Sequence, residues 1–376
     1  MSVSFRTGLS KGERSFGIAY AYAMRVSVLD QSPIPAGSAG ADALRNSIDL
    51  ARMADDLGYH RYWVAEHHGT PMLACASPEA LIGPIAAATS RIRVGSGGVM
   101  LPHYSPLKVA ETFSMLSAMF PERIDLGVGR APGTDPLTMF ALQRDRRETV
   151  PDDFPQQLAE LLAYIRDGLP AGHPFERLTQ LPGLPHLPEP WLLGSSPQSG
   201  IWAAESGLPY AFADFISPAG AAIVQRYRDE FKPSRIQPSP YVVVAAWALC
   251  AETDDEASRL ASSARMAFTL MHQGQLIPIP PVDTALRFFE ERNSATASIT
   301  RRRRWILGSP DNVRRELEAL AEEYQADEVM IVTITHDHGA RRRSYELIAD
   351  ALRVKEEAFR PDAREPSPRT ATTRTR

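Results

Sequence analysis

Short apolar segments with the composition of buried strands recur along the chain at a nearly constant spacing. The first four start 35, 32 and 32 residues apart, which is the length that one strand and its returning helix require. The eight expected strands are residues 25–31, 60–67, 92–101, 124–131, 190–195, 210–215, 241–250 and 328–335. The pattern therefore predicts repeated βα units built on a parallel sheet.

Amphipathic segments lie between these strands. In residues 42–57, apolar side chains recur at the spacing of one helix face, and Gly58 follows as a helix stop. Residues 311–324 show a similar pattern. Eight strands that alternate with helices favour a closed (β/α)8 TIM barrel of the α/β class, with an open doubly wound sheet as the alternative.

Two stretches break the period and divide the chain further. Residues 132–151 after the fourth strand and about 273–304 after the seventh are long enough to be insertions or lids, where this fold usually carries function. Residues 24–356 are expected to form the compact domain. Residues 1–23 read as an N-terminal extension, and residues 357–376, rich in Pro, Thr and Arg, as a disordered tail.

Composition excludes several classes of function. The net charge of −4 argues against nucleic-acid binding, which needs a basic surface. No apolar run reaches the ~18 residues of a membrane span. The two cysteines form no closely spaced pair, so neither a disulfide framework nor a zinc site is indicated. These features favour a cytoplasmic enzyme.

The second expected strand ends in three ionisable residues, Glu66, His67 and His68. In a TIM barrel the catalytic groups lie at the carboxyl ends of the strands, where Asp30 also falls. Imidazole titrates near neutral pH and suits proton transfer. We therefore predict His67, Glu66 and Asp30 as catalytic residues. Because a strand alternates its faces, only one of the two histidines is expected to point inward.

Glycines interrupt the third strand at Gly95, Gly97 and Gly98. Glycine weakens a strand, so its presence here needs a reason. Either a flat ligand packs directly on the backbone, or the chain makes a bulge at a corner of the barrel. The two interpretations are equally supported by the sequence.

A phosphate site is predicted where the fifth strand turns into a helix. Gly194 and Ser195 precede Ser196, which can cap the helix, and the first turn contains Ser199 and no acidic residue. Helix amides and hydroxyls are then available to an anion. Arg130, at the end of the fourth expected strand, could bind the same anion through its guanidinium group, or it could instead form a surface salt bridge. The glycines around Arg130 lack the spacing of the dinucleotide-binding fingerprint, so a Rossmann-type dinucleotide site is rejected.

Histidines also follow the last strand, in His336-Asp337-His338. With His67 and His68 they could form a metal site. No carboxylate stands at a metal-ligand spacing, and cationic residues follow directly, so we expect no metal.

Taken together, these motifs resemble the bacterial luciferase-like flavin monooxygenases, in a branch that includes antibiotic-tailoring enzymes. The match runs in order from about residue 24 to 352. It is carried by Ser27-Val28-Leu29-Asp30-Gln31-Ser32-Pro33, Trp63-Val64-Ala65-Glu66-His67-His68, Gly95-Ser96-Gly97-Gly98-Val99-Met100-Leu101-Pro102, Arg123-Ile124-Asp125-Leu126-Gly127-Val128-Gly129-Arg130, Trp191 to Ser199, Gly308-Ser309-Pro310 and His336-Asp337-His338.

The resemblance implies an oxidoreductase that uses reduced FMN and O₂ to oxygenate a small organic substrate, with the flavin supplied by a separate reductase. It implies that His67 is the active-site base and that Arg130 and the Ser195–Ser196 turn contact the phosphate. A cis peptide at Gly97–Gly98 would lie under the flavin. Secondary metabolism and a homodimer, through residues 81–89 and 114–120, are further expectations.

Three rival functions stay open at this stage. A deazaflavin-dependent dehydrogenase would share the fold and transfer hydride without O₂. A metal-dependent hydrolase would use the four histidines. A catalytically silent flavin-binding subunit would pair with an active homologue.

Overall fold

The computed structural model describes residues 24–130, 136–142, 153–166, 168–178, 181–235, 237–292 and 304–354. Eight parallel strands form a ring, because β6 pairs with β7 as well as with β5, and β9 pairs with both β7 and β1. The strands of the ring are β1 (Arg25–Asp30), β2 (Arg61–Val64), β3 (Arg93–Met100), β4 (Ile124–Gly129), β5 (Glu189–Gly194), β6 (Tyr210–Ala213), β7 (Val242–Cys250) and β9 (Glu328–Val332). The predicted TIM barrel is confirmed.

A ninth strand was not predicted. β8 (Trp305–Gly308) pairs in parallel with the carboxyl-terminal half of β7, from Trp247 opposite Trp305 to Cys250 opposite Gly308. It lies outside the ring as an appendage of β7, which is long enough at nine residues to pair with β9 and β8 in turn.

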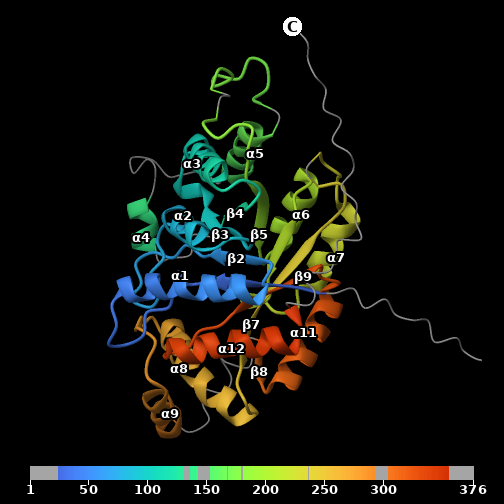
Figure 1. Cartoon of the computed structure of the whole chain (residues 1–376). Coiled ribbons are helices and arrows are strands. Elements are labelled where there is room, and N and C mark those ends of the chain that lie inside the picture. Colours follow the sequence, from blue (N-terminus) through green and yellow to red (C-terminus); the bar gives the residue numbers. More distant parts are fainter. Residues whose placement is uncertain are drawn as a thin grey trace, which may run out of the picture.

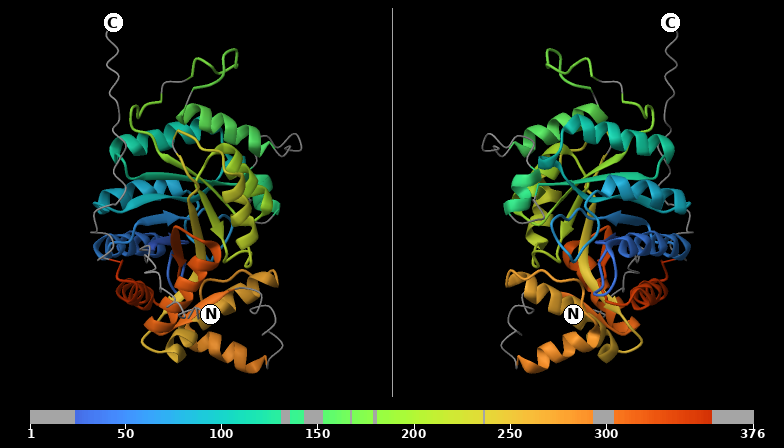
Figure 2. Two further views of the ribbon diagram at one scale, coloured as in Figure 1. Left: turned by 90° about the vertical axis from the view of Figure 1, so that its right-hand side faces the viewer. Right: turned by 90° about the vertical axis from the view of Figure 1, so that its left-hand side faces the viewer.

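Helices surround the ring (Figure 1). Those that follow strands directly are α1 (Gly40–Leu57), α2 (Pro78–Ala88), α3 (Pro106–Met119), α6 (Pro197–Ser206), α7 (Ala221–Glu230), α11 (Pro310–Tyr324) and α12 (His338–Ala351). The two longest connections carry α4 (Pro136–Leu142) and α5 (Phe154–Ile165) between β4 and β5, and α8 (Asp254–His272) and α9 (Val282–Glu291) between β7 and β8. Figure 2 shows α8 and α9 together at the edge of the molecule.

These long connections are the insertions predicted after the fourth and seventh strands. Parts of both, residues 131–135, 143–152 and 293–303, lie outside the described residues, as do the expected extension 1–23 and tail 357–376. No helix in the described ranges has the length and apolar character to cross a bilayer.

Local signals explain where two helices begin and end. α1 ends at Gly58, whose φ of 85° is left-handed and whose amide donates to the carbonyls of Ala54 and Asp55. α6 begins at the extended residue Ser196 and has Pro197 in its first turn. Both boundaries agree with the sequence prediction.

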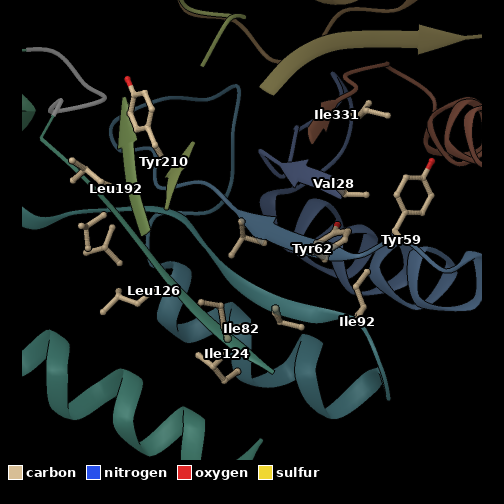
Figure 3. Packing of buried hydrophobic residues seen from close by; sticks show 14 of the residues in the cluster. Val28, Tyr59, Tyr62, Ile82, Ile92, Ile124, Leu126, Leu192, Tyr210 and Ile331 are labelled. Atoms are coloured by element: carbon tan, nitrogen blue, oxygen red, sulfur yellow. The ribbon is translucent and has the colours of Figure 1, made fainter. Parts of the chain in front are cut away.

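Strand alternation divides the buried side chains into two layers. Outward-facing residues such as Val28, Tyr62 and Leu126 pack against the helices (Figure 3). Inward-facing residues such as Leu29 and Trp63 fill the barrel itself. The side chains therefore separate a helix-facing core from the interior where a ligand can bind.

Buried ion pairs close the amino-terminal end of the barrel. The Arg61 guanidinium donates to Asp125 at 2.8 Å and to Glu328 at 3.1 Å, and lies 4.4 Å from the Trp191 ring centre. Burial opposes the ionisation of both carboxyls, but the arginines beside them outweigh it and lower the pKa of each. Access to the interior is therefore left to the opposite, carboxyl-terminal end.

Candidate active site

A cavity of about 600 Å³ lies at the carboxyl-terminal side of the barrel, chiefly over β3 to β6. Its apolar wall includes Leu29, Trp63 and Met330 from inside the ring. Polar residues enter it from the strand ends and from the connections that follow them. A volume of this size is sufficient for a small-molecule ligand.

The residues predicted to hold a phosphate meet at one side of this cavity. Gly194, Ser195, Ser196 and Ser199 line it together with Arg130, which comes from the end of the neighbouring strand. The first turn of α6 contains no acidic residue, so its amides and positive dipole end favour an anion. The arrangement has the donors that a phosphate requires.

The Ser199 hydroxyl shapes this turn. It donates to the Ser196 carbonyl at 2.7 Å and lies 2.9 Å from the Tyr210 hydroxyl. A Cβ atom placed on Gly194 would overlap Ser199, so glycine is needed for the strand to pass this close to the helix. Ser199 is thus partly engaged within the protein, whereas Ser195 has no hydrogen bond of its side chain recorded in the described structure.

Gly97 and Gly98 also line the cavity, and the peptide bond between them is cis, as the resemblance implied. A Cβ on Gly97 would lie 2.5 Å from Leu29 Cδ1, and one on Gly98 would lie 2.7 Å from the Gly127 carbonyl oxygen. The register with β4 shifts between Gly97 and Val99. The register shift agrees with the bulge, and the irregular strand is also a wall of the cavity; that a flat ligand packs on it stays a prediction.

Glu66 is fully buried and its two carboxylate oxygens accept three hydrogen bonds. His68 Nε2 and the Tyr104 hydroxyl donate to Oε1 at 2.7 and 2.9 Å, and the Met100 amide donates to Oε2 at 2.9 Å. Glu66 thereby joins the end of β2 to the end of β3. It does not line the cavity.

His67 and His68 have different surroundings, and neither lines the cavity. His68 turns to Glu66, whereas the Nδ1 atom of His67 is buried and has no hydrogen-bond partner in the described structure. Burial and the adjacent His68 lower the pKa of His67 to about 4. His67 is therefore neutral near pH 7. It is not among the residues that line the cavity.

Asp30, the third predicted catalytic residue, lies on the outer side of the barrel wall. Its carboxylate accepts hydrogen bonds from Arg341 at 2.6 Å, from the Tyr62 hydroxyl and from the Ser32 amide at 2.7 Å. Burial opposes its ionisation, but the Arg341 charge outweighs burial and lowers its pKa. The structure does not bring Asp30 to the cavity, because residue 30 has the opposite strand parity from the inward-facing Leu29.

The histidines after β9 have separate partners. Asp337 accepts a hydrogen bond from the Ala340 amide at the start of α12, and His338 pairs with Asp49 at 2.8 Å. His336 Nε2 lies 3.2 Å from the Ala36 carbonyl oxygen. Among the residues that the structure describes, no group of three or more potential metal ligands gathers.

Sequence reasoning missed the part of the cavity that helices supply. Trp202 of α6 lies beneath the Arg130 guanidinium, with its ring centre 5.5 Å away. Phe154 of α5 lines the cavity beside Asp153, and His103 enters it from the short 3₁₀ helix η1 (Leu101–His103). Trp202 and Phe154 carry no strand-end signal, whereas His103 belongs to the polar residues that the sequence places at the ends of the expected strands, without a role assigned to it.

The family model for luciferase-like monooxygenases matches residues 24–328. The chain is 45% identical over 335 residues to the uncharacterized protein YwcH of Bacillus subtilis, which covers 87% of this chain and 98% of that protein. It is 40% identical over 332 residues to a luciferase-like monooxygenase of Escherichia coli, covering 88% and 97%.

Solved structures agree with these matches. The crystal structure of apo-MsnO8 superposes with a TM-score of 0.81 at 41% identity and covers 89% of this chain and 98% of MsnO8. More distant structures show the shared fold alone. They include an FMN complex of the oxygenating constituent of 3,6-diketocamphane monooxygenase, with a TM-score of 0.64 at 20% identity, and an F420-dependent secondary alcohol dehydrogenase, with 0.60 at 14%.

Proposed function

This chain belongs to the luciferase-like monooxygenase family, and on that premise we propose that it is an FMN-dependent monooxygenase. Reduced FMN and O₂ would be its co-substrates, and one oxygen atom would enter a small organic substrate. The resemblance to antibiotic-tailoring enzymes extends the proposal to secondary metabolism. The supporting observation is that predicted phosphate donors and a glycine-lined wall, from separate strands, border one cavity.

The residues present fit FMN. A phosphate monoester needs a cation, hydroxyls and amide donors, and Arg130, Ser195 and Ser196 stand with the start of α6 at one side of the cavity. A flat ring system needs a wall without protruding side chains, and Gly97 and Gly98 provide one. We propose that these residues, with Gly194 and Ser199 shaping the turn, hold the cofactor.

Reduced FMN would supply the two electrons that activate O₂, which no side chain of the protein can do. The protein's part would be to orient the ligands, exclude water and manage protons. Leu29, Trp63 and Met330 make the deep wall apolar. His67, neutral near pH 7 and with a buried Nδ1 atom that has no hydrogen-bond partner in the described residues, would accept a proton.

An anaerobic titration with FMN reduced by dithionite tests this proposal. We expect saturable binding to the reduced cofactor and O₂ uptake when air is admitted. Arg130→Ala should weaken binding, whereas Arg226→Ala, on the exposed face of α7, should not. A screen of loaded enzyme against cell extract, with mass detection of one added oxygen atom, would then identify the substrate. Absence of any affinity for reduced FMN would contradict the proposal.

The deazaflavin-dependent dehydrogenase is the second candidate, because an F420-dependent enzyme shares the fold. Such an enzyme would transfer hydride and consume no O₂. The same titration with reduced deazaflavin in place of FMN separates the two: binding of deazaflavin alone, without O₂ uptake, favours the dehydrogenase.

The partners follow from the same proposal. A separate flavin reductase would supply reduced FMN, most simply in the cytoplasm where reduced nicotinamides are available. A homodimer is also proposed through α2 and α3, where Met115 and Met119 of α3 are 52% and 59% exposed. Apolar side chains on a helix surface commonly mark a protein interface. Sedimentation of wild type and of a Met115→Glu, Met119→Glu variant tests this.

A further inference from the structure

His103 is the histidine that lines the cavity among the residues that the structure describes. It is the last residue of η1, which continues directly from β3 and the glycine wall. The resemblance that assigned His67 gave no role to this residue. Its ring borders the space that also contains Arg130 and Asp153.

One buried carboxylate fixes both ends of the turn that carries His103. Glu66 accepts from the Met100 amide just before η1 and from the Tyr104 hydroxyl just after it, both at 2.9 Å. Because Glu66 is fully buried, these bonds are shielded from water and position the turn strongly. A carboxylate so occupied by donors is suited to holding neighbours in place.

The same carboxylate orients a second imidazole against His103. His68 Nε2 donates to Glu66 at 2.7 Å, which sets the tautomer and plane of the His68 ring. That ring meets His103 edge to face, with centres 6.3 Å apart and planes at 89°. His103 thus contacts the His68 ring and also borders the cavity that Arg130 and Asp153 line.

We propose that His103 is a second proton-transfer residue of the reaction and that Glu66 and His68 are positioning residues for it; this inference rests on the proposed monooxygenase function. Monooxygenation takes two electrons from reduced FMN, places one atom of O₂ in the substrate and releases the other as water. His103, as imidazolium, gives a proton to the oxygen atom that leaves. An N–H bond breaks, an O–H bond forms, and solvent returns the proton to the neutral imidazole.

The division of labour between the two histidines has a physical basis. His67 is neutral near pH 7, because its pKa is lowered to about 4, and it can accept a proton but has none to give as a cation. His103 is connected to the buried Glu66 carboxylate through His68, whose ring contacts His103 and whose Nε2 donates to Glu66. His103 is assigned the role of the acid because its ring, unlike that of His67, lines the cavity.

The first test asks whether FMN binds next to His103, and it needs no turnover. Oxidised FMN added to the apoprotein should shift the imidazole NMR signals of His103 and leave those of His186, an exposed residue outside the cavity lining, unchanged. In Glu66→Gln the His103 signals should move even without FMN, because the hydrogen bonds that hold its turn and orient His68 are altered, and Glu66→Asp should restore them in part. His103 signals that respond neither to FMN nor to the Glu66 substitutions would overturn the proposal.

The second test follows the oxidation of enzyme-bound reduced FMN after mixing with O₂. Wild type should show a pH profile with a step from a single group, and His103→Gln should lose that step and react on the order of 100-fold more slowly. Added imidazole should restore the rate of His103→Ala, while His186→Gln should behave as wild type. If the wild-type protein neither binds FMN nor reacts with O₂, the proposed function is refuted. If the wild-type protein reacts and His103→Gln reacts at the same rate, only the role of His103 is refuted.

Discussion

Asp30 and Arg341 form a 2.6 Å ion pair between the end of β1 and helix α12, on the outer side of the barrel wall. Both side chains are almost completely buried, and Arg341 also donates to the Thr333 carbonyl at 2.9 Å. The pair joins the first and last strand–helix units of the ring. Its position favours a role in closing the barrel.

Asp30→Asn should therefore destabilise the protein by about 3–5 kcal/mol, since it leaves a buried arginine without its counter-charge. Asp49→Asn is the matched control, because the pairs of Asp49 with Arg342 and with His338 are partly exposed to solvent and should contribute less than about 1 kcal/mol each. Chemical denaturation measures both. Equal losses in the two variants would contradict the expected difference.

The pH dependence of this ion pair follows from the direction in which the fold shifts the pKa of Asp30. The folded-state pKa of Asp30 is lowered from 3.8, so its contribution to stability is complete above that value and is lost as the pH falls through the folded pKa. The stability difference between wild type and Asp30→Asn should shrink in strong acid. Denaturation curves recorded at decreasing pH check this.

Arg61→Leu should lower the free energy of unfolding by about 3–5 kcal/mol, because Asp125 and Glu328 would lose a buried counter-charge. The pKa of both carboxyls is lowered in the fold, so wild type loses this stability in acid and the variant loses less of it. Arg226→Leu, in an exposed pair within α7, is the control and should change little. FMN affinity should survive in Arg61→Leu wherever it stays folded, since Arg61 lies at the closed end.

Gly194→Ala should weaken FMN binding roughly tenfold or more, equivalent to about 1.4 kcal/mol or more. The added methyl group would overlap Ser199 and displace the turn that we propose holds the phosphate. Gly40→Ala is the control, because a Cβ there would lie 3.8 Å from its nearest neighbours. Isothermal titration of both variants decides, and an unchanged Kd in Gly194→Ala would remove this turn from the site.

His67→Ala should abolish turnover while FMN binding stays largely intact, because the residue does not line the cavity and is proposed to act on protons. Turnover at the wild-type rate would refute that role. The variant should also resist acid better. The folded pKa of about 4 lies below the usual 6.5, so falling pH between these values protonates the unfolded chain first and destabilises wild type.

The strand–helix repeat and the local boundaries could be predicted well because they depend on short-range patterns. Gly58 ends α1 and Ser196 begins α6, since left-handed and capping conformations are preferences of single residues. β8 escaped prediction. Four residues from Trp305 to Gly308 are too few to show a period, and their pairing depends on the overhang of β7.

The candidate site was predictable where strand ends supply it. Gly97, Gly98, Arg130 and the serine turn were expected together because the ends of parallel strands meet on one face, and all line the cavity. Trp202 and Phe154 could not be anticipated, because the register of α5 and α6 over the barrel is set by packing between elements distant in sequence.

The sequence by itself determined the number and order of the βα units and which residue types end each strand, because both depend on the spacing of residues along the chain. Only the tertiary structure decided which of those residues face the ligand. Strand parity turned Asp30 outward to Arg341 and left Leu29 inside. Hydrogen bonds from His68 and from both ends of η1 engaged Glu66, and η1 placed His103 at the cavity. Such choices depend on partners that meet only when the barrel closes.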